Sequence, residues 1–163
     1  MEDVAQHLQQ EAIKRTDPGQ RDEFARSAFN RFYYATFIPL SRSLADMKDQ
    51  WTELPHKDVP ELLRGSLIRE LKLGKKRAEK LGDNDTAGLC ARAISNCHEV
   101  AAIMETGYAV RVAADYKSEV RIDFSSGADF KLSNVPVSIA KQWPKRVEAY
   151  VGSISAAMRQ LSD

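Results

Sequence analysis

Arg111 and Asp115 are the residues whose type and spacing most clearly suggest chemistry. They continue the apolar seam of a predicted helix over about 85–118, in which steps of four and three residues link Cys90, Ile94, Cys97, Ala101, Met104 and Tyr108. A carboxylate four residues after an arginine can reach its guanidinium group, and a buried arginine without a partner would cost several kcal/mol. Two interpretations follow: a structural ion-pair network, or charges that line a cleft.

A third charged residue, Arg31, interrupts an apolar stripe of the predicted helix over about 18–48. Steps of four and three residues define that stripe as Phe24, Ala28, Arg31, Ala35 and Ile38, and we expect it to face the core. Arg31 would then meet Asp115 across the bundle. We therefore predict one polar cluster of Arg31, Arg111 and Asp115 at the centre of the fold.

A second stripe on the same helix, Phe29, Tyr33 and Phe37, lies on nearly the opposite side. A helix that is apolar on two faces is either central to its bundle or shared with a partner chain. On this basis we predict a homodimer whose interface uses these three rings.

Basic residues concentrate between Arg64 and Lys80, where seven basic and two acidic residues give a local net charge of +5. Lys75, Lys76 and Arg77 form the densest part. Such a face could hold RNA phosphates, although charge runs of this kind are usually solvated helix surfaces. The whole chain carries 24 basic and 23 acidic residues, net +1, so overall charge favours neither a nucleic-acid nor a membrane partner.

The elements that must position these residues are mostly helical. Helices are predicted over about 2–15, 18–48, 59–81 and 85–118, with a last helix from Pro136. Between the last two, Val120, Ile122 and Phe124 alternate, then Phe130 and Leu132 alternate after "SSGAD", which predicts a β-hairpin near 120–133. The fold class is therefore an all-α bundle of about five helices with an inserted hairpin, in a single domain over 1–163.

Capping and proline signals set the expected helix ends. Asp17 and Pro18 are typical of a helix start, and Asp58 with Glu61 predicts a capping box before the third helix. Pro39 and Pro144 are expected to kink the helices that contain them.

The sequence lacks the motifs that are typical of several function classes. No metal-ligand spacing, phosphate-binding loop or nucleophile elbow occurs, so neither a metal nor another cofactor is expected. Cys90 and Cys97 would be separated by about 10 Å along one helix, too far for a disulfide, and reduced cysteines fit the cytoplasm. The start "MEDVAQHLQQ" is unlike a signal peptide, and no apolar run is long enough to span a membrane.

Two short motifs resemble a known family. "NRFYYATF" (Asn30 to Phe37) is similar to the SRxYYAxF signature of HEPN domains, and "RVAADY" (Arg111 to Tyr116) is similar to their later RxxADY motif. The resemblance covers roughly 5–118 and the last helix. It implies a helical bundle that pairs as a homodimer and acts in toxin–antitoxin, phage-defence or RNA-processing systems, with a nucleotidyltransferase-type or other defence protein as partner.

The resemblance also implies candidate catalytic residues. Active HEPN domains are metal-independent ribonucleases with an arginine, four to six residues, and then a histidine. Carried over, the arginine is Arg111, but the histidine position falls on Tyr116, whose side-chain type has an unperturbed pKa near 10 and is a poor base at neutral pH. Arg111, Asp115 and Tyr116 are the catalytic candidates on this basis.

Other histidines could supply the missing imidazole. Arg92 and His98 match the motif spacing as an alternative pair, although their side chains would diverge by about 120° on a helix. His56 resembles a histidine often found before the third HEPN helix, and is equally well explained as a loop residue.

Two functional classes therefore stay open. The first is an RNA-directed defence or toxin-type protein, either an RNA-associated adaptor or a degenerate endoribonuclease that uses Arg111 to stabilise the phosphorane, with Arg31, Lys75, Lys76 and Arg77 contacting RNA. The second is a non-catalytic helical dimerisation or interaction module. Tyr116 favours the second class, and the expected buried charge cluster favours the first.

Overall fold

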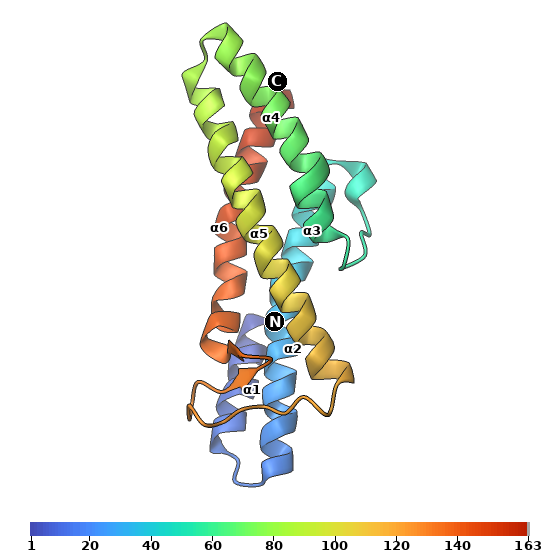
Figure 1. The fold of residues 1–163 in the computed structure, drawn as a ribbon, viewed down its shortest axis with the longest axis vertical. Coiled ribbons are helices and arrows are strands. Elements are labelled where there is room, and N and C mark those ends of the chain that lie inside the picture. The colour runs from blue at the N-terminus through green and yellow to red at the C-terminus, as the bar shows by residue number, and fades with distance from the viewer. Residues whose placement is uncertain (163) are drawn as a thin grey trace. The chain divides into compact units, whose positions relative to one another are not determined.

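The computed structural model describes residues 1–162 and is helical over 79% of the chain (Figure 1). Its long helices are α1 (Glu2–Lys14), α2 (Pro18–Met47), α5 (Asn84–Tyr116) and α6 (Val137–Ser162). A further helical run consists of α3 (Val59–Leu62), the π-helical turn η2 (Leu63–Leu67) and α4 (Ile68–Leu81), and a short 3-10 turn η1 covers Asp49–Trp51. The predicted all-α class with five helices is confirmed.

Internal packing divides the chain into two compact units. Unit 1 comprises Met1–Phe37 and Thr106–Lys145, and unit 2 comprises Ile38–Glu105 and residues 146–162. Helices α2, α5 and α6 each contribute residues to both units. Within residues 1–162, no helix is both long and apolar enough to cross a lipid bilayer.

Unit 1 is built around the aromatic face of α2. Ala25, Phe29, Phe32 and Tyr33 are fully or almost fully buried, at helical spacing. The Phe29 ring meets Phe130 edge-on, with centroids 5.9 Å apart. This face therefore packs against the segment that follows α5.

This arrangement corrects two predictions about α2. The stripe that faces the core contains Phe29 (0% exposed), Tyr33 (1%) and Phe37 (8%), so these rings are covered inside the chain and cannot form a dimer interface. Arg31, predicted to be central, lies exposed on the other side. The aromatic stripe is buried because it removes far more apolar area from water than a stripe of two alanines, one phenylalanine and one isoleucine. The homodimer itself stays a prediction.

The hairpin forms later in the chain than predicted. Strands β1 (Lys131–Leu132) and β2 (Val135–Pro136) pair antiparallel around Ser133 and Asn134, which have φ of 50° and 65°. Two consecutive residues with positive φ are typical of the type I′ turn that joins tight hairpins. The predicted pairing survives only as one bridge, in which Asp123 and Lys131 exchange two backbone hydrogen bonds of 2.9 Å.

Helix ends in the structure agree with some capping predictions and not with others. Asp17 accepts a 2.8 Å hydrogen bond from the Gln20 backbone N–H, so the predicted cap of α2 is confirmed. Asp58 makes no side-chain capping bond, and the predicted capping box is wrong. Both α2 and α6 continue through their internal prolines.

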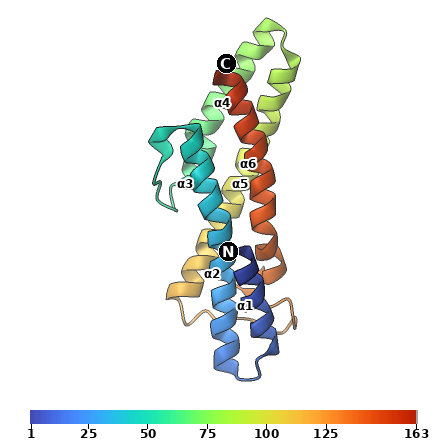
Figure 2. The same cartoon turned by 180° about the vertical axis from the view of Figure 1, so that it is seen from behind.

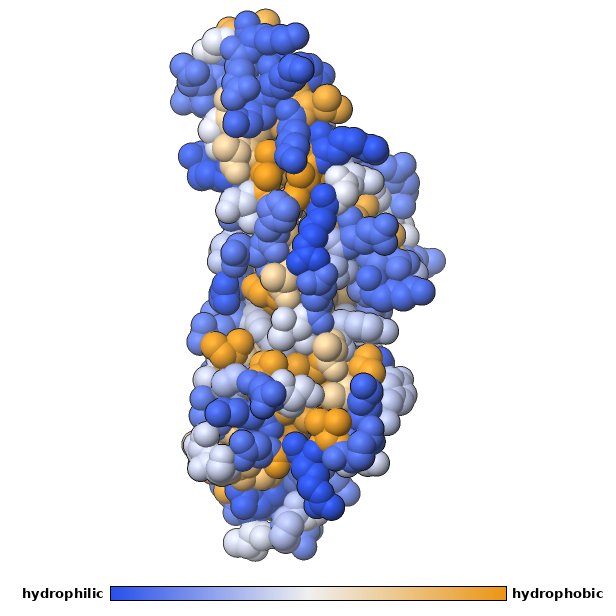
Figure 3. Space-filling view, viewed as in Figure 1, coloured by the Kyte–Doolittle hydropathy of each residue, from blue (hydrophilic) through white to orange (hydrophobic). Residues whose placement is uncertain are grey.

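The turn between α4 and α5 in unit 2 is set by a glycine and a capping carboxylate. Gly82 ends α4 with a φ of 73°, a left-handed conformation that glycine adopts without strain. The Asp83 carboxylate then accepts a 3.0 Å bond from the Thr86 backbone N–H, and hydrogen bonding from Thr86 lowers the pKa of Asp83. Figure 3 shows mostly hydrophilic side chains over this turn.

Candidate functional site

The two motifs that resemble HEPN signatures meet in unit 1 around Arg111. Arg111 Nη2 donates hydrogen bonds to the hydroxyl oxygens of Tyr34 (3.1 Å) and Tyr116 (3.4 Å). Its Nε lies 2.9 Å from Asp115 Oδ2, but the N–H makes no hydrogen bond there, so this contact is an ion pair only. Asn30 Nδ2 donates a 2.7 Å bond to Asp115 Oδ1. We call these five residues the Arg111 cluster.

The aromatic rings of the cluster also contact the cation. The Arg111 guanidinium carbon lies 5.1 Å from the Tyr116 ring centroid and 5.8 Å from that of Tyr34, within cation–π range. Burial lowers the pKa of Arg111, but the Tyr34 hydrogen bond and the Asp115 charge outweigh it, so the pKa is raised overall. Arg111 is therefore a permanent cation, and most of its charge is already balanced by Asp115.

The Arg111 cluster is partly open to solvent. The side chains of Arg111 and Asp115 are 18% and 26% exposed, and Tyr116 is 70% exposed. The prediction that Arg111 and Asp115 form an ion pair is confirmed, but the expected central position is wrong. The cost of leaving either charge unpaired is accordingly smaller than for a fully buried pair.

Arg31 is not part of this cluster. The first motif contributes Asn30 and Tyr34 instead, on either side of the predicted arginine. On a helix, Asn30 and Tyr34 point about 100° and 60° away from Arg31 in the same rotational sense. These two residues therefore share a side of α2 that Arg31 does not occupy.

A second arginine, Arg26, holds the end of α5 in place. Arg26 Nη1 donates to the carbonyl oxygens of Ala113 (3.1 Å) and Lys117 (3.3 Å), and Nη2 donates to that of Val120 (2.6 Å). Its Nε donates to Asp22, which also accepts a 3.4 Å bond from the Ile122 backbone N–H. The carbonyls of Ala113 and Lys117 also accept backbone hydrogen bonds from Lys117 and Val120. Arg26 thus adds a further donor to each of them, bonds the Val120 carbonyl as well, and fixes the turn that carries Asp115 and Tyr116.

The sequence did not single out Arg26 or Asp22. Their spacing at i and i+4 on α2 was a usable signal for an ion pair, but nothing in the sequence indicated which carbonyl groups the arginine would meet. Asn30 and Tyr34 lie within a motif, but the sequence assigns neither of them a role of its own.

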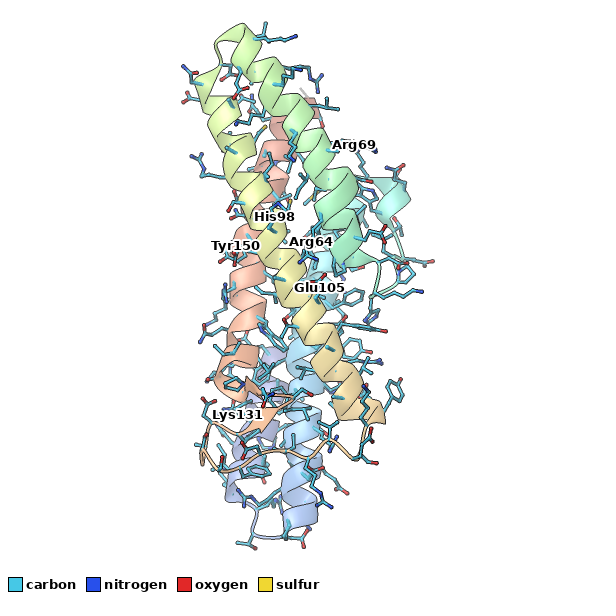
Figure 4. All side chains as sticks on the ribbon, viewed as in Figure 1. Arg64, Arg69, His98, Glu105, Lys131 and Tyr150 are labelled. Carbon is cyan, nitrogen blue, oxygen red and sulfur yellow. The ribbon has the colours of Figure 1, made fainter. Side chains whose placement is uncertain are left out.

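The alternative catalytic pair lies at the surface of unit 2. Arg92 and His98 are both exposed on α5, and Figure 4 labels His98. Within residues 1–162 neither of them makes a hydrogen bond or ion pair. His7 is exposed on α1, and His56 lies half-buried in the segment before α3. The Arg111 cluster consequently contains no imidazole among its five members.

The basic segment of unit 2 divides into paired and unpaired cations. Lys75 forms a 3.4 Å ion pair with Glu79. Arg64 donates two hydrogen bonds to the Glu105 carboxylate, one of 2.8 Å, and Figure 4 shows the two side chains pointing toward one another. The hydrogen bonds from Arg64 lower the pKa of Glu105.

The other five cations of α4 remain exposed and form no ion pair within the described part of the chain. We call them the α4 basic face: Arg69, Lys72, Lys76, Arg77 and Lys80. Four of them follow one another at steps of three or four residues and so share one side of the helix. A shallow hollow of about 480 Å³ lies along this side, lined by Leu73 with Lys76, Arg77 and Lys80.

Metal and thiol chemistry find little support in the described residues. Over residues 1–162, no group of three or more histidine, cysteine, aspartate or glutamate side chains is arranged to hold a metal ion. Cys90 and Cys97 are buried free thiols, and burial raises the pKa of Cys97 to about 12. The thiol of Cys97 therefore stays protonated and is a poor nucleophile.

Comparisons with protein-family models, with curated proteins and with solved structures find no match to this chain. The functional argument therefore depends on the geometry of the Arg111 cluster and on the charge of the α4 basic face.

Proposed function

We propose that this protein is a HEPN-like module that binds RNA on the α4 basic face without cleaving it. The observation that carries the proposal is the presence on one helix of five exposed cations that form no ion pair within residues 1–162, in a chain whose net charge is only +1. Concentrated positive charge on one face attracts a polyanion by local contacts, even where the overall charge is balanced.

The distribution of ion pairs supports a binding role for this face. The carboxylates near the basic segment are used by Lys75 and Arg64, through Glu79 and Glu105. The remaining cations are left free to neutralise phosphates, and each phosphate neutralised releases counterions into solution. Leu73, which is 57% exposed between them, offers an apolar contact for an unstacked base.

The Arg111 cluster supports the absence of cleavage. Hydrolysis of a phosphodiester by a metal-independent ribonuclease needs a general base within hydrogen-bond reach of the attacking hydroxyl. The cluster offers two tyrosine hydroxyls and a carboxylate already bound by Arg111 and Asn30. We therefore assign the cluster to holding α2 and the end of α5 together within unit 1.

The HEPN likeness is part of the same proposal. The two motifs that suggest it lie on different helices, and four polar side chains from them contact one arginine or its carboxylate. The implied setting, a toxin–antitoxin or phage-defence system with homodimerisation and a nucleotidyltransferase-type partner, stays a prediction that the neighbouring genes would test.

RNA binding can be measured directly with a fluorescently labelled single-stranded RNA at several salt concentrations. Replacing Lys72, Lys76 and Lys80 by glutamine should weaken binding for every sequence. The salt slope should fall by roughly 2, because each phosphate that a lysine neutralises on a single strand contributes about 0.7 to it. The RNA should remain full length after long incubation without metal.

A matched variant provides the control. Arg121, Lys141 and Lys145 are exposed in unit 1 and make no ion pair within residues 1–162, so replacing them by glutamine removes the same total charge. Equal weakening in both triple variants would indicate unspecific attraction and contradict the proposal, as would the absence of RNA binding at low salt. RNA cleavage that persists in Arg111→Lys and disappears in His98→Gln would instead favour the alternative pair.

A further inference from the structure

Unit 2 contains a cleft of about 700 Å³ that the RNA-binding proposal does not use. Its walls come from the end of α2, from α4 and from the last turns of α6, which run beside α4 (Figure 2). Leu161 of α6 packs so closely on α4 at Gly74 that a Cβ atom there would lie 2.3 Å from Leu161 Cδ1. The cleft volume falls within the range of roughly 300–1,000 Å³ that is usual for small-molecule sites.

The charges that line the cleft leave two arginines available. Three cations and two carboxylates contribute to the lining. Lys48 and Glu70 neutralise one another at 2.5 Å. Arg77 from α4 and Arg159 from α6 make no ion pair within residues 1–162, and only Asp46 remains to oppose them.

Two arginines from different helices favour a phosphate over a carboxylate ligand. A guanidinium group presents a planar fork of donors that matches phosphate oxygens, and a phosphomonoester has three oxygens to share between two such forks. Hydroxyl groups of Ser43 and Ser155 in the same lining add neutral donors, whereas the Ser162 hydroxyl already donates to the Met158 carbonyl oxygen at 3.0 Å.

The rest of the lining suits a flat apolar group. Met47, Leu73, Met158 and Leu161 contribute side chains to the cleft. Methionine is flexible and polarisable and makes favourable contacts with aromatic rings. A ligand with a phosphate at one end and an aromatic ring at the other would meet both kinds of surface.

We propose that this cleft binds a nucleoside monophosphate group, with the phosphate between Arg77 and Arg159 and the base against the methionines. Two sources share this chemistry: a free nucleotide, and the phosphorylated end of an RNA chain. The second is possible because Leu73 and Arg77 line both the cleft and the hollow along the α4 basic face. The inference stands without the RNA-binding proposal, since a free nucleotide needs only the cleft.

The test is titration of the full chain with adenosine 5′-monophosphate, followed by calorimetry and by amide chemical shifts of cleft residues. We expect binding, with adenosine and inorganic phosphate each at least about tenfold weaker, because each lacks one half of the nucleotide. Arg159→Gln should weaken nucleotide binding about tenfold. Asp46→Asn should tighten it, because removing the opposing carboxylate favours the phosphate.

Two controls locate the site and separate the sources. Arg42 is exposed on α2 and does not line the cleft, so Arg42→Gln should leave nucleotide affinity unchanged. Tighter binding of a 5′-phosphorylated trinucleotide than of the mononucleotide would identify the RNA end as the source, and equal or weaker binding would identify the free nucleotide.

Three results would overturn the inference. They are no measurable binding of the mononucleotide, affinity for adenosine or phosphate alone equal to that for the nucleotide, and an Arg159→Gln variant with unchanged affinity. Loss of RNA binding in the Lys72, Lys76 and Lys80 variant with nucleotide binding retained would leave this inference intact. If the native chain binds RNA but no nucleotide, the nucleotide-binding inference is refuted and the proposed RNA-binding function is not affected.

Discussion

Two arginines of unit 1 and two arginines of unit 2 have opposite surroundings. In unit 1, Arg26 is bonded to three carbonyl groups and a carboxylate, and Arg111 to two tyrosines with a carboxylate beside it. In unit 2, Arg77 and Arg159 line a cleft without an ion pair in the described residues. Arg26 and Arg111 therefore stabilise unit 1, whereas Arg77 and Arg159 are available to ligands in unit 2.

The contrast follows from what surrounds each guanidinium. Arg26 and Arg111 lie near the end of α5, where their N–H groups bond backbone carbonyls and tyrosine hydroxyls and so hold α2 and that end of α5 together. The arginines of the cleft are surrounded by solvent and a slight excess of positive charge. Substitutions should consequently reduce folding stability in unit 1 and ligand affinity in unit 2.

The largest stability effect should come from Arg26→Ala. It removes donors from the carbonyls of Ala113, Lys117 and Val120, and hydrogen bonds to charged groups contribute a net of about 1.5–3 kcal/mol each. We expect the free energy of unfolding, measured by urea denaturation, to fall by about 3 kcal/mol. Arg77→Ala in unit 2 should change it by less than about 0.5 kcal/mol. Equal effects of the two substitutions would break the comparison.

A smaller loss is expected from Asp115→Ala. The substitution leaves Arg111 and Asn30 without their shared carboxylate, but partial exposure lets water replace it. The free energy of unfolding should fall by about 1–2 kcal/mol. Asp115→Asn should lower the free energy of unfolding by less, because its amide oxygen can still accept a hydrogen bond from Asn30. A loss above about 4 kcal/mol would mean that the cluster is effectively buried.

Two helix glycines allow a similar comparison of packing. A Cβ on Gly107 would lie 3.0 Å from Tyr33 Cδ2 and 3.4 Å from Trp143, two buried rings that cannot yield easily, whereas Gly74 faces the end of the Leu161 side chain. Alanine gains up to about 1 kcal/mol of helix propensity at either position. We expect Gly107→Ala to lower the thermal midpoint and Gly74→Ala to leave it nearly unchanged, since Leu161 can adopt another rotamer.

The smallest effect concerns pH and the Arg64–Glu105 pair. The pKa of Glu105 is lowered from 4.5 by its hydrogen bonds from Arg64, so the pair contributes stability above the unfolded pKa. That contribution is lost as pH falls through the lower folded pKa. The thermal midpoint of the native chain should exceed that of Glu105→Gln slightly at neutral pH, and the difference should vanish in acid. A difference that stays the same from neutral pH into acid would contradict this assignment.

The helices were predictable because their signals are local. Asp17 and Pro18 mark the start of α2, and Gly82 with Asp83 marks the turn into α5. Each signal acts within a few residues of itself, where spacing in the sequence fixes spacing in space. Strand pairing is less local, and the turn of the observed hairpin uses Ser133 and Asn134 at positive φ in place of the predicted glycine-bearing loop.

The site was only half predictable for a related reason. Arg111 and Asp115 lie one turn apart, so their ion pair could be expected from sequence. Which stripe of α2 faces the core depends on the side chains that pack against it. One of them is Phe130, which contacts Phe29 although it lies far along the chain from it. The predicted positions of Arg31 and of Phe29, Tyr33 and Phe37 are wrong for this one reason.

The division of the chain has a consequence for synthesis on the ribosome. The aromatic face of α2, with Phe29 and Tyr33, emerges about a hundred residues before Phe130 and Trp143, which belong to the same unit. At roughly 5–20 residues per second, this face waits on the order of 5–20 s for its partners. During that interval the nascent chain presents an uncovered aromatic surface, so the speed of translation sets how long ribosome-associated chaperones have to bind it.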